Sequence, residues 1–299
     1  MARKPTTPPV TDPPVLSTIV FDLQITAESS IVHRGDDFDY GSDTTTLFNR
    51  ESMITSNGEL QMIPVISGSS LRGVLRRISE EMTAEVLRYP GKLPTPAAHL
   101  VRNGGRLAKA ATPLSDERER ELRALIPHLA LFGGAASARI MSGLLAVEKV
   151  LPEVAELEHV LTGRPVRQPL QPVDLFMTAE YSTHLADART PSGPAVLTDE
   201  GSPQLRFGFE VMVAGTRLHS RIHLRHATPL QVAYFQSVLA EFAAHGHLGG
   251  RRSVGHGQIT ASITTTVRRG ALPAPAESDW TAHLTSHRDA AIAALTALT

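Results

Sequence analysis

The predicted order of elements indicates an α+β fold with the ferredoxin-like succession strand, helix, strand, strand, helix, strand. Two kinds of pattern support this. β-Branched residues dominate 18–28 and 258–267, as in strands, and apolar residues recur at helical spacing within 69–86 and 229–244. Further strands are expected at 143–151, 206–213 and 217–225. The sheet of such a fold can carry RNA on one face or in adjoining loops, as RRM-like RNA-recognition folds do.

Composition bounds the class of protein. With 299 residues, the chain can hold one large domain, or one domain with a sizeable insertion. It has no cysteine, which excludes disulfides and thiolate metal sites. Residues 1–14 are proline-rich and lack the apolar core of a signal peptide, so we expect a disordered arm there. No stretch reaches membrane-spanning length, and we expect a cytoplasmic protein without a membrane partner.

The net charge of −1 conceals an uneven distribution. From Val211 to Ala276 the only acidic residue is Glu241, against seven arginines and six histidines. With histidine counted as neutral, the segment carries seven positive charges and one negative, a net charge of +6. A local basic surface can bind a polyanion even when the whole chain is nearly neutral.

Two loops, at 63–77 and 249–258, combine glycines, hydroxyls and arginines without a carboxylate. Such segments bring backbone N–H groups and guanidiniums against phosphate. In the first, Ser69 or Ser70 is expected to cap a helix whose Arg72 and Arg76 share one face. The presence of two such loops in one chain suggests that the ligand is an extended polyanion. The RNA-binding residues predicted from these loops and the strand at 217–225 are Ser67, Gly68, Ser69, Ser70, Arg72, Arg76, Arg77, Arg221, His223, Gly249, Gly250, Arg251, Arg252, Ser253 and His256.

Alternation along 217–225 places leucines and isoleucine on one face of a strand and cations on the other. The cations are Arg217, His219, Arg221, His223 and Arg225. The preceding strand, 206–213, is expected to turn into this one at 214–216. We therefore expect one face to pack on the core while the other presents positive charge.

The remaining segments read as insertions and a terminal helix. The polar stretch 29–59 resembles a long functional loop. Residues 89–127 look like an inserted helical region, and the proline-rich residues 161–204 look like a protruding arm. Residues 271–299 are expected to form a C-terminal amphipathic helix after a domain spanning 15–270.

Three motifs in order point to a known family. Residues 64–76, Pro-Val-Ile-Ser-Gly-Ser-Ser-Leu-Arg-Gly-Val-Leu-Arg, resemble the I-P-G-S-S-L-[KR]-G-x-[LIM]-R signature of RAMP-superfamily proteins from CRISPR effector complexes. They depart from it at Ile66-Ser67-Gly68, where many members have Pro-Gly. Residues 131–133 resemble the family's Leu-Phe-Gly element, and 248–257 resemble its C-terminal glycine-rich loop. The set spans roughly residues 60 to 260, and it is most similar to the backbone subunits of type IV complexes, then to those of type III.

The resemblance implies a ferredoxin-like palm and a protruding thumb hairpin, here carried by 161–204. It also implies a subunit that polymerises as a helical homo-oligomer along CRISPR RNA and presents that guide to a complementary target nucleic acid. Other CRISPR effector subunits would be its partners. No cofactor and no metal site are expected.

Enzymatic alternatives remain open. Type III backbone subunits cleave target RNA with an aspartate after the first strand, and Asp43 is the residue here that resembles it; this would be a metal-dependent endoribonuclease. A guide-processing endoribonuclease would instead use His247 or His256 as general base. We favour a non-cleaving scaffold, since the pattern around Asp43 is otherwise not preserved. A phosphate-binding metabolic enzyme is disfavoured because Walker, dinucleotide-binding and nucleophile-elbow motifs are missing.

Overall fold

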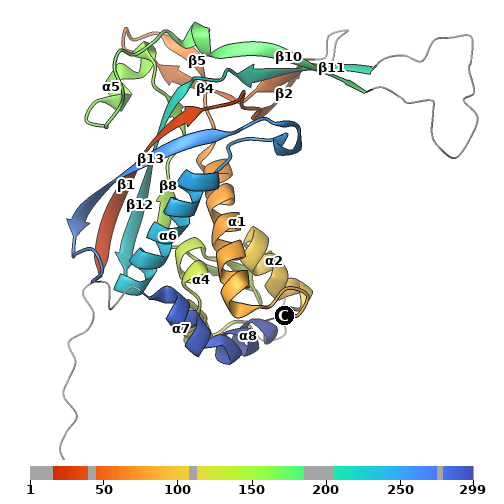
Figure 1. Cartoon of the computed structure of the whole chain (residues 1–299), viewed down its shortest axis with the longest axis vertical. Helices are drawn as coiled ribbons and strands as arrows, with labels where there is room; N and C mark the ends of the chain where they lie inside the picture. Colours follow the sequence, from red (N-terminus) through yellow and green to blue (C-terminus); the bar gives the residue numbers. More distant parts are fainter. Residues whose placement is uncertain (1–15, 40–44, 108–112, 185–204, 275–278, 299) are drawn as a thin grey trace, which may run out of the picture.

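The computed structural model describes residues 16–39, 45–107, 113–184, 205–274 and 279–298. Its main sheet is antiparallel, and the strands lie in the order β13 (Ile259–Arg269), β1 (Ser17–Ala27), β12 (Arg217–Ala227) and β8 (Leu145–Val147). The short β9 (Leu151–Pro152) also pairs with β12. Helices α1 (Gly68–Leu87) and α6 (Pro229–His245) lie against this sheet (Figure 1). The predicted α+β class is confirmed.

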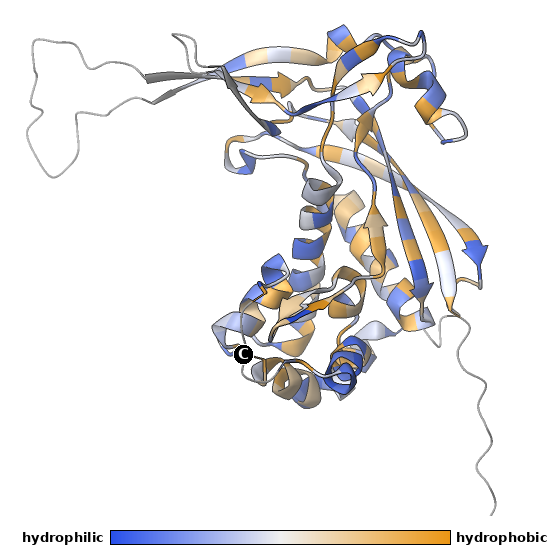
Figure 2. Ribbon diagram, turned by 180° about the vertical axis from the view of Figure 1, so that it is seen from behind, coloured by the Kyte–Doolittle hydropathy of each residue, from blue (hydrophilic) through white to orange (hydrophobic). Residues whose placement is uncertain are grey.

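The core lies between the sheet and these two helices. Ile19, Phe21, Leu23 and Ile25 share one face of β1 and are all fully buried, and Val20 and Asp22 on its other face are buried as well. The ring of Phe21 meets that of Phe235 on α6 edge to face, with centroids 5.4 Å apart. Figure 2 shows the alternation of hydrophobic and hydrophilic residues along these strands.

The first helix begins earlier than predicted. Its N-cap is Ser67, whose Oγ accepts the N–H of Ser70, so the expectation that Ser69 or Ser70 caps it is wrong. Gly68 at the first helical position is required by a close approach. A Cβ there would lie 2.5 Å from the carbonyl oxygen of Val147. The Ser-Gly pair therefore sets helix α1 directly against the strand β8.

The second helix follows the prediction closely. Thr228 and Gln231 form a reciprocal capping box, and Pro229 occupies the first turn. The predicted region 143–151 forms two short strands, β8 and β9, instead of one. Similarly, 271–299 holds two helices, α7 (Trp280–Ser286) and α8 (Arg288–Thr296), instead of one.

A helical lobe forms a second core below the sheet. The inserted region contributes α2 (Thr95–Asn103), α3 (Asp116–Leu125) and α4 (Pro127–Phe132), followed by the hairpin β6 (Gly134–Ala136) and β7 (Arg139–Met141). Helices α7 and α8 pack on it, with Leu284 and Leu295 fully buried in its core. In the part of the chain that the structure describes, no helix is long and apolar enough to cross a membrane.

A second sheet occupies the opposite end, in the order β10 (Met177–His184), β11 (Leu205–Met212), β3 (Thr45–Phe48) and β2 (Arg34–Asp39). Beside it lies the hairpin of β4 (Arg50–Ile54) and β5 (Leu60–Pro64). The stretch 29–59 thus contains the three strands β2, β3 and β4, and the prediction of one long loop is wrong. The predicted strand 206–213 does precede the turn at 214–216, but β11 belongs to this second sheet and not to that of β12.

The predicted arm 161–204 begins later than expected. Its first part, with η2 (Val173–Phe176), packs beside η1 (Ala155–Leu157), α5 (Glu158–Leu161) and β5, and Leu161, Val173 and Phe176 are buried. β10 and β11 extend from this lobe as a hairpin (Figure 1). Residues 185–204 and the predicted disordered arm 1–14 lie outside the described residues.

A buried polar network joins α1, α4 and α6. The hydroxyl of Tyr234 lies 2.7 Å from both Ser79 Oγ and Thr83 Oγ1, and Ser79 Oγ lies 2.8 Å from Nδ1 of His128. Nε2 of His128 is 2.8 Å from the carbonyl oxygen of Val101. Every polar group in the network has a partner, as burial demands. Burial, reinforced by the charge of Arg76, lowers the pKa of His128 to about 3.

Acid should destabilise the protein through this histidine. The folded-state pKa of about 3 lies below the ordinary 6.5, so only the unfolded state binds the proton between them. The stability from neutral His128 is complete above pH 6.5 and is lost as the pH falls toward 3, at about 1.4 kcal/mol per pH unit. We expect urea unfolding at pH 5 to show about 2 kcal/mol less stability from this group than at pH 6.5. In His128→Asn, the loss of unfolding free energy between pH 6.5 and pH 5 should be smaller by that amount. If the variant loses as much stability as wild type, the pKa shift of His128 is not the cause.

Candidate nucleic-acid interface

The two glycine- and arginine-containing loops meet at one short segment. The N–H of Gly250 donates to the carbonyl oxygen of Val32 at 2.7 Å. The N–H of Ser67 donates to Nε2 of His33 at 3.2 Å. Burial lowers the pKa of His33, which keeps this nitrogen a neutral acceptor. Because residues 32 and 33 are consecutive, two loops some 180 residues apart in sequence are anchored to the same short segment.

Glycine is required where the second loop touches this segment. Gly249 has φ +80°, and a Cβ on it would lie 2.2 Å from the carbonyl oxygen of Val32. A Cβ on Gly257 would lie 2.1 Å from the carbonyl oxygen of Leu248. Between these contacts, η3 (Arg252–Val254) is exposed, including Arg252 and Ser253. The loop is thus held at its two ends and presents its middle to solvent.

Arg251 and His256 connect this loop to the base of the β10–β11 hairpin. The guanidinium of Arg251 lies 4.1 Å from the ring centroid of Phe209 on β11, a cation–π contact. The ring of His256 meets that of Phe209 edge to face, with centroids 5.7 Å apart, and its Nδ1 is 3.0 Å from Ser30 Oγ. Its Nε2 is 3.8 Å from a carboxylate oxygen of Glu180 on β10. Loop and hairpin therefore form one structural unit.

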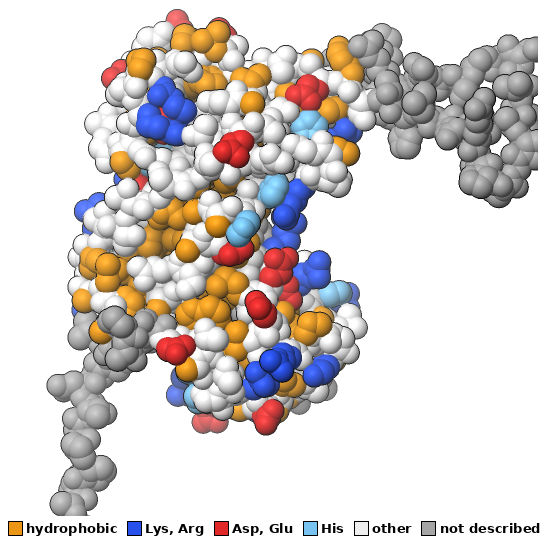
Figure 3. All heavy atoms as spheres, viewed as in Figure 1, with side chains coloured by type: hydrophobic (Ala, Val, Ile, Leu, Met, Phe, Trp, Pro, Cys, Tyr) orange, Lys and Arg blue, Asp and Glu red, His pale blue; other side chains and the backbone are white. Residues whose placement is uncertain are grey.

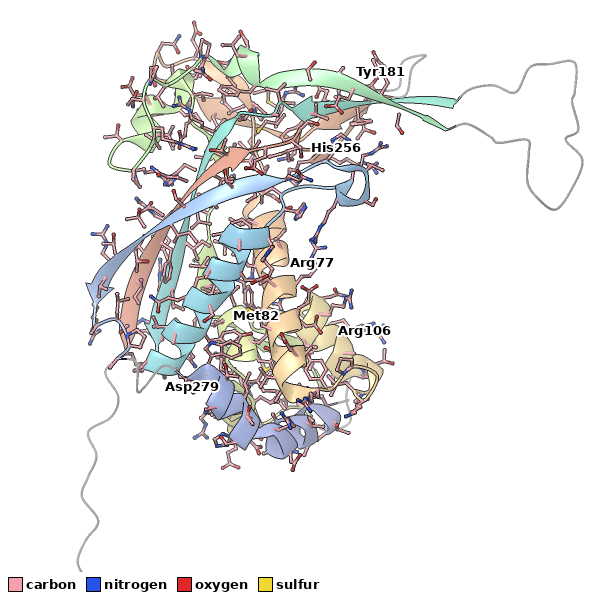
Figure 4. All side chains as sticks on the ribbon, viewed as in Figure 1. Arg77, Met82, Arg106, Tyr181, His256 and Asp279 are labelled. Atoms are coloured by element: carbon pink, nitrogen blue, oxygen red, sulfur yellow. The ribbon has the colours of Figure 1, made fainter. Side chains whose placement is uncertain are left out.

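The start of α1 and the end of α2 line an open groove of about 570 Å³. Ser69, Ser70 and Arg77 come from α1, and Arg102 and Asn103 from α2. Arg77 and Arg102 are exposed, and neither has a carboxylate partner among the described residues. In Figure 4, Arg77 lies on the concave side of the molecule, beneath the loop that carries His256. The groove thus offers hydroxyls and uncompensated guanidiniums close to a helix N-terminus.

Arg72 and Arg76 also line this groove, but backbone carbonyl groups occupy their guanidiniums. Arg72 donates to the carbonyl oxygens of Leu145 at 2.8 Å and Phe132 at 2.7 Å. Arg76 is buried and donates to those of Phe132 at 2.7 Å and Gly133 at 3.1 and 3.2 Å. Burial lowers the pKa of Arg76 to about 10, and the charge of Arg72 adds to the effect, so it remains a cation at neutral pH. Both guanidiniums cap the C-terminal carbonyls of α4, which gives them a structural role.

The cations of β12 are matched by carboxylates. Arg221 Nε lies 2.7 Å from Asp22 Oδ1, and His223 Nε2 lies 2.9 Å from Glu148 Oε1. Arg164 also bonds Glu148, at 2.8 Å. Burial works to raise the pKa of Glu148, but the hydrogen bonds from His223 and Arg164 outweigh it and leave that pKa lowered. The predicted cationic face is therefore largely compensated, because neighbouring elements supply counter-charges to Arg221 and His223, whereas Arg225 is exposed without a carboxylate partner among the described residues.

Removing Arg221 should affect stability more than RNA binding. Its partner Asp22 is only 7% exposed in its side chain, and Arg221→Ala would leave that carboxylate with His219, 3.2 Å away, as its remaining ionisable neighbour. We expect the free energy of unfolding to fall by about 2 kcal/mol, with RNA affinity nearly unchanged. Urea unfolding and a filter-binding titration check this. A large loss of affinity in a variant that is fully folded would instead place RNA on the sheet.

The alternative catalytic residues are placed as follows. Asp43 lies outside the described residues. Nδ1 of His247 lies 3.1 Å from the carbonyl oxygen of His245, and His245 lies 2.9 Å from Glu241 at the end of α6. His256 is held by Ser30 and Phe209 as above. Among the residues that the structure describes, no group of histidine, aspartate and glutamate side chains is arranged to hold a metal ion.

Sequence reasoning missed three residues of the interface. Arg102 and Asn103 belong to the inserted region, and nothing in their local sequence shows that α2 returns to the start of α1. Phe209 belongs to a strand, where an aromatic side chain is expected in a core and not under an arginine. Their one signal in the sequence was composition, since arginines 102 and 106 flank glycines 104 and 105 as in the two loops, although this does not reveal where α2 lies.

Comparison with known proteins identifies the family of the chain. Residues 53–260 match the model of the RAMP superfamily. A chain of a solved Type IV-B CRISPR complex is 44% identical, with a TM-score of 0.63, and the match covers 86% of this chain and 95% of that one. No curated protein matches. The family model spans both glycine-containing loops, and the chain therefore belongs to the RAMP superfamily.

Proposed function

We propose that this protein is the CRISPR RNA-binding backbone subunit of a type IV-like ribonucleoprotein. It polymerises along the guide RNA and presents it for pairing with a complementary target nucleic acid, alongside other effector subunits. The observation that supports this best is that Val32 and His33 anchor both loops, the one that carries Arg251 and Arg252 and the one that opens the helix whose Arg77 lines the groove with Arg102. Four guanidiniums spread over two loops and a groove suit an extended backbone better than one phosphate.

The topology supports a ferredoxin-like palm. In chain order, β1, α1, β8, β12, α6 and β13 follow the succession strand, helix, strand, strand, helix, strand. In space the strands lie in the order β13, β1, β12, β8, so the first and third strands of the motif are central. The extending hairpin of β10 and β11 is the thumb in this proposal. The contact between Arg251 and Phe209 sets the thumb's base beside the RNA-binding loop.

The guanidiniums of Arg72 and Arg76 hold the interface together without contacting phosphate. They tie the first turns of α1 to the Phe132-Gly133 carbonyls, and Gly133 precedes the strand that supports α2. This positions Arg102 opposite Arg77 in the groove. The RNA-contacting residues in this proposal are Ser69, Ser70, Arg77, Arg102, Arg251, Arg252 and Ser253.

The test is fluorescence anisotropy of the full chain with a labelled single-stranded RNA, followed by a gel of the same RNA after incubation with Mg²⁺. We expect binding that weakens steeply with salt, because phosphate neutralisation releases counterions, and intact RNA. Cleavage lost in Asp43→Ala would support the target-cleaving alternative. Cleavage of repeat RNA lost in His247→Ala or His256→Ala would support the guide-processing alternative. No binding at low salt would reject all three.

A further inference from the structure

A cavity of about 610 Å³ lies between the later turns of α1 and helix α2. Arg102 lines both this cavity and the groove assigned to RNA, so the two spaces adjoin. The walls are mainly apolar, with Ala84 from α1, Leu93 from the connecting loop, and Ala98 and Val101 from α2. Val101 belongs to the core of the helical lobe, and Ala84 and Leu93 pack on that core. The cavity is therefore pre-formed, as ligand pockets usually are.

Three glutamates of α1 also line the cavity. Glu80 is half-buried, and Glu81 and Glu85 are exposed. Among the described residues, none of the three has a basic partner within ion-pair distance. The hydroxyl of the buried Tyr89 donates to Oε1 of Glu80 at 3.3 Å. Burial and the charge of Glu80 raise the pKa of Tyr89, so the phenol stays protonated and orients this carboxylate in the cavity wall.

The charge thus changes sign along α1, from the groove to the cavity. Arg77 and Glu81 are four residues apart, so their side chains are neighbours on one helix face. Arg102 is the cation at the junction of the two spaces. Lys92 and Arg88, which are close in sequence, do not line the cavity, and Arg88 lines a separate one. Figure 3 shows Lys or Arg side chains beside Asp or Glu side chains on the concave side of the molecule, where Figure 4 places Arg77.

A nucleotide has the same succession of properties. Its phosphate is an anion, and its base is a flat, mostly apolar group whose edge carries N–H donors. The base lies roughly one helical turn from the phosphate, so a phosphate between Arg77 and Arg102 brings its own base to the cavity. Apolar walls suit the faces of a base, and carboxylates accept hydrogen bonds from its edge. A second phosphate would meet like charge there, which favours a base over the RNA backbone.

We infer that this cavity is a subsite for one unstacked base of the RNA strand and that it favours guanine. Guanine presents two adjacent N–H donors on its Watson–Crick edge, and the two oxygens of one carboxylate can accept both. Uracil presents a single N–H between two carbonyl oxygens, which a carboxylate repels. The inference rests on the proposed function, to which it adds a base contact that phosphate contacts do not supply. The apolar walls admit any base, so strands of different sequence still bind.

Fluorescence anisotropy of the full chain with two labelled RNAs of equal length tests the subsite. One strand contains uridines alone, and in the other isolated guanosines replace some of them. Wild type should bind the guanine-containing strand roughly tenfold more tightly, because hydrogen bonds to a charged group are strong. Glu80→Gln combined with Glu81→Gln should lose most of this ratio. The matched control, Glu117→Gln with Glu121→Gln on α3, removes the same charge from exposed positions and should keep the ratio.

A second variant blocks the cavity without changing its charge. Ala98→Trp places an indole in the cavity from a half-buried position of α2, so the variant should bind both strands as wild type binds the uridine strand. Ala240→Trp, at an exposed position of α6, is the control and should show the wild-type ratio. Circular dichroism and unfolding curves check that each variant is folded.

Different results contradict the subsite and the proposed function. Equal affinity of wild type for the two strands would overturn the subsite and leave RNA binding by the loops and groove in place. A wild-type ratio that persists in folded Ala98→Trp, or in the double glutamine variant of α1, would overturn it as well. If wild type binds neither strand at low salt, the proposed function itself is refuted.

Discussion

Arg76→Met should lower the free energy of unfolding by about 3 kcal/mol. The side chain is 9% exposed, and its guanidinium supplies two hydrogen bonds to the carbonyl oxygen of Gly133 and one to that of Phe132. Methionine keeps much of the volume but donates nothing, so Gly133 loses these donors while Phe132 keeps only Arg72. Burial of unsatisfied carbonyl groups is the main penalty.

The matched control is Arg77→Met, one residue further along the same helix. Arg77 is exposed and lines the groove, so its removal should leave the unfolding curve close to that of wild type while weakening RNA binding. Urea unfolding at neutral pH compares the two. If Arg76→Met is as stable as Arg77→Met, Arg76 does not have the structural role described above. Arg76 would then again be a candidate for RNA contact.

The largest functional effect should come from changing Arg77, Arg102, Arg251 and Arg252 together to alanine. We expect affinity for single-stranded RNA to fall roughly 100-fold at moderate salt, because four charge-assisted phosphate contacts are lost. All four side chains are exposed, so the fold should persist, although the Arg251 contact with Phe209 is lost too. Circular dichroism and unfolding curves of the variant confirm that it is folded.

A variant of equal charge change controls for long-range electrostatics. Lys92, Arg118, Arg268 and Arg269 are exposed, and their change to alanine removes the same number of positive charges. The last two end β13, an 11-residue strand that begins near the glycine-arginine loop. At about 3.3 Å per residue, the strand separates them from that loop by roughly 35 Å. This variant should bind RNA nearly as tightly as wild type.

The sequence predicted elements best where local signals were complete. Helix α6 was predicted almost to the residue, because Thr228, Pro229 and Gln231 form a full cap before a clear apolar stripe. By contrast, the stretch that holds β2, β3 and β4 looked like one loop, since their strand character depends on pairing with distant β11, with each other and with β5. The Arg72 and Arg76 spacing correctly placed both side chains on one helix face, but periodicity does not reveal what covers that face.

The same limit explains why the geometry of the interface could not be predicted from the sequence. The two loops were recognised from their residue types, and their contact through Val32 and His33 could not be, since no local pattern links residues so distant in sequence. The sheet cations Arg221 and His223 were assigned to RNA from alternation alone. Their counter-charges, Asp22 and Glu148, lie on other elements and became apparent only when register was known.

The slope of log K against log salt concentration tests the central claim most directly. If Arg77, Arg102, Arg251 and Arg252 each neutralise one phosphate, the slope of the fourfold alanine variant should be shallower than that of wild type by about 3, at roughly 0.7 per phosphate on a single strand. The control variant should keep the wild-type slope. Equal slopes for wild type and the fourfold variant, or an equal reduction in the control, would contradict the claim that the two converging loops and their groove hold one RNA strand.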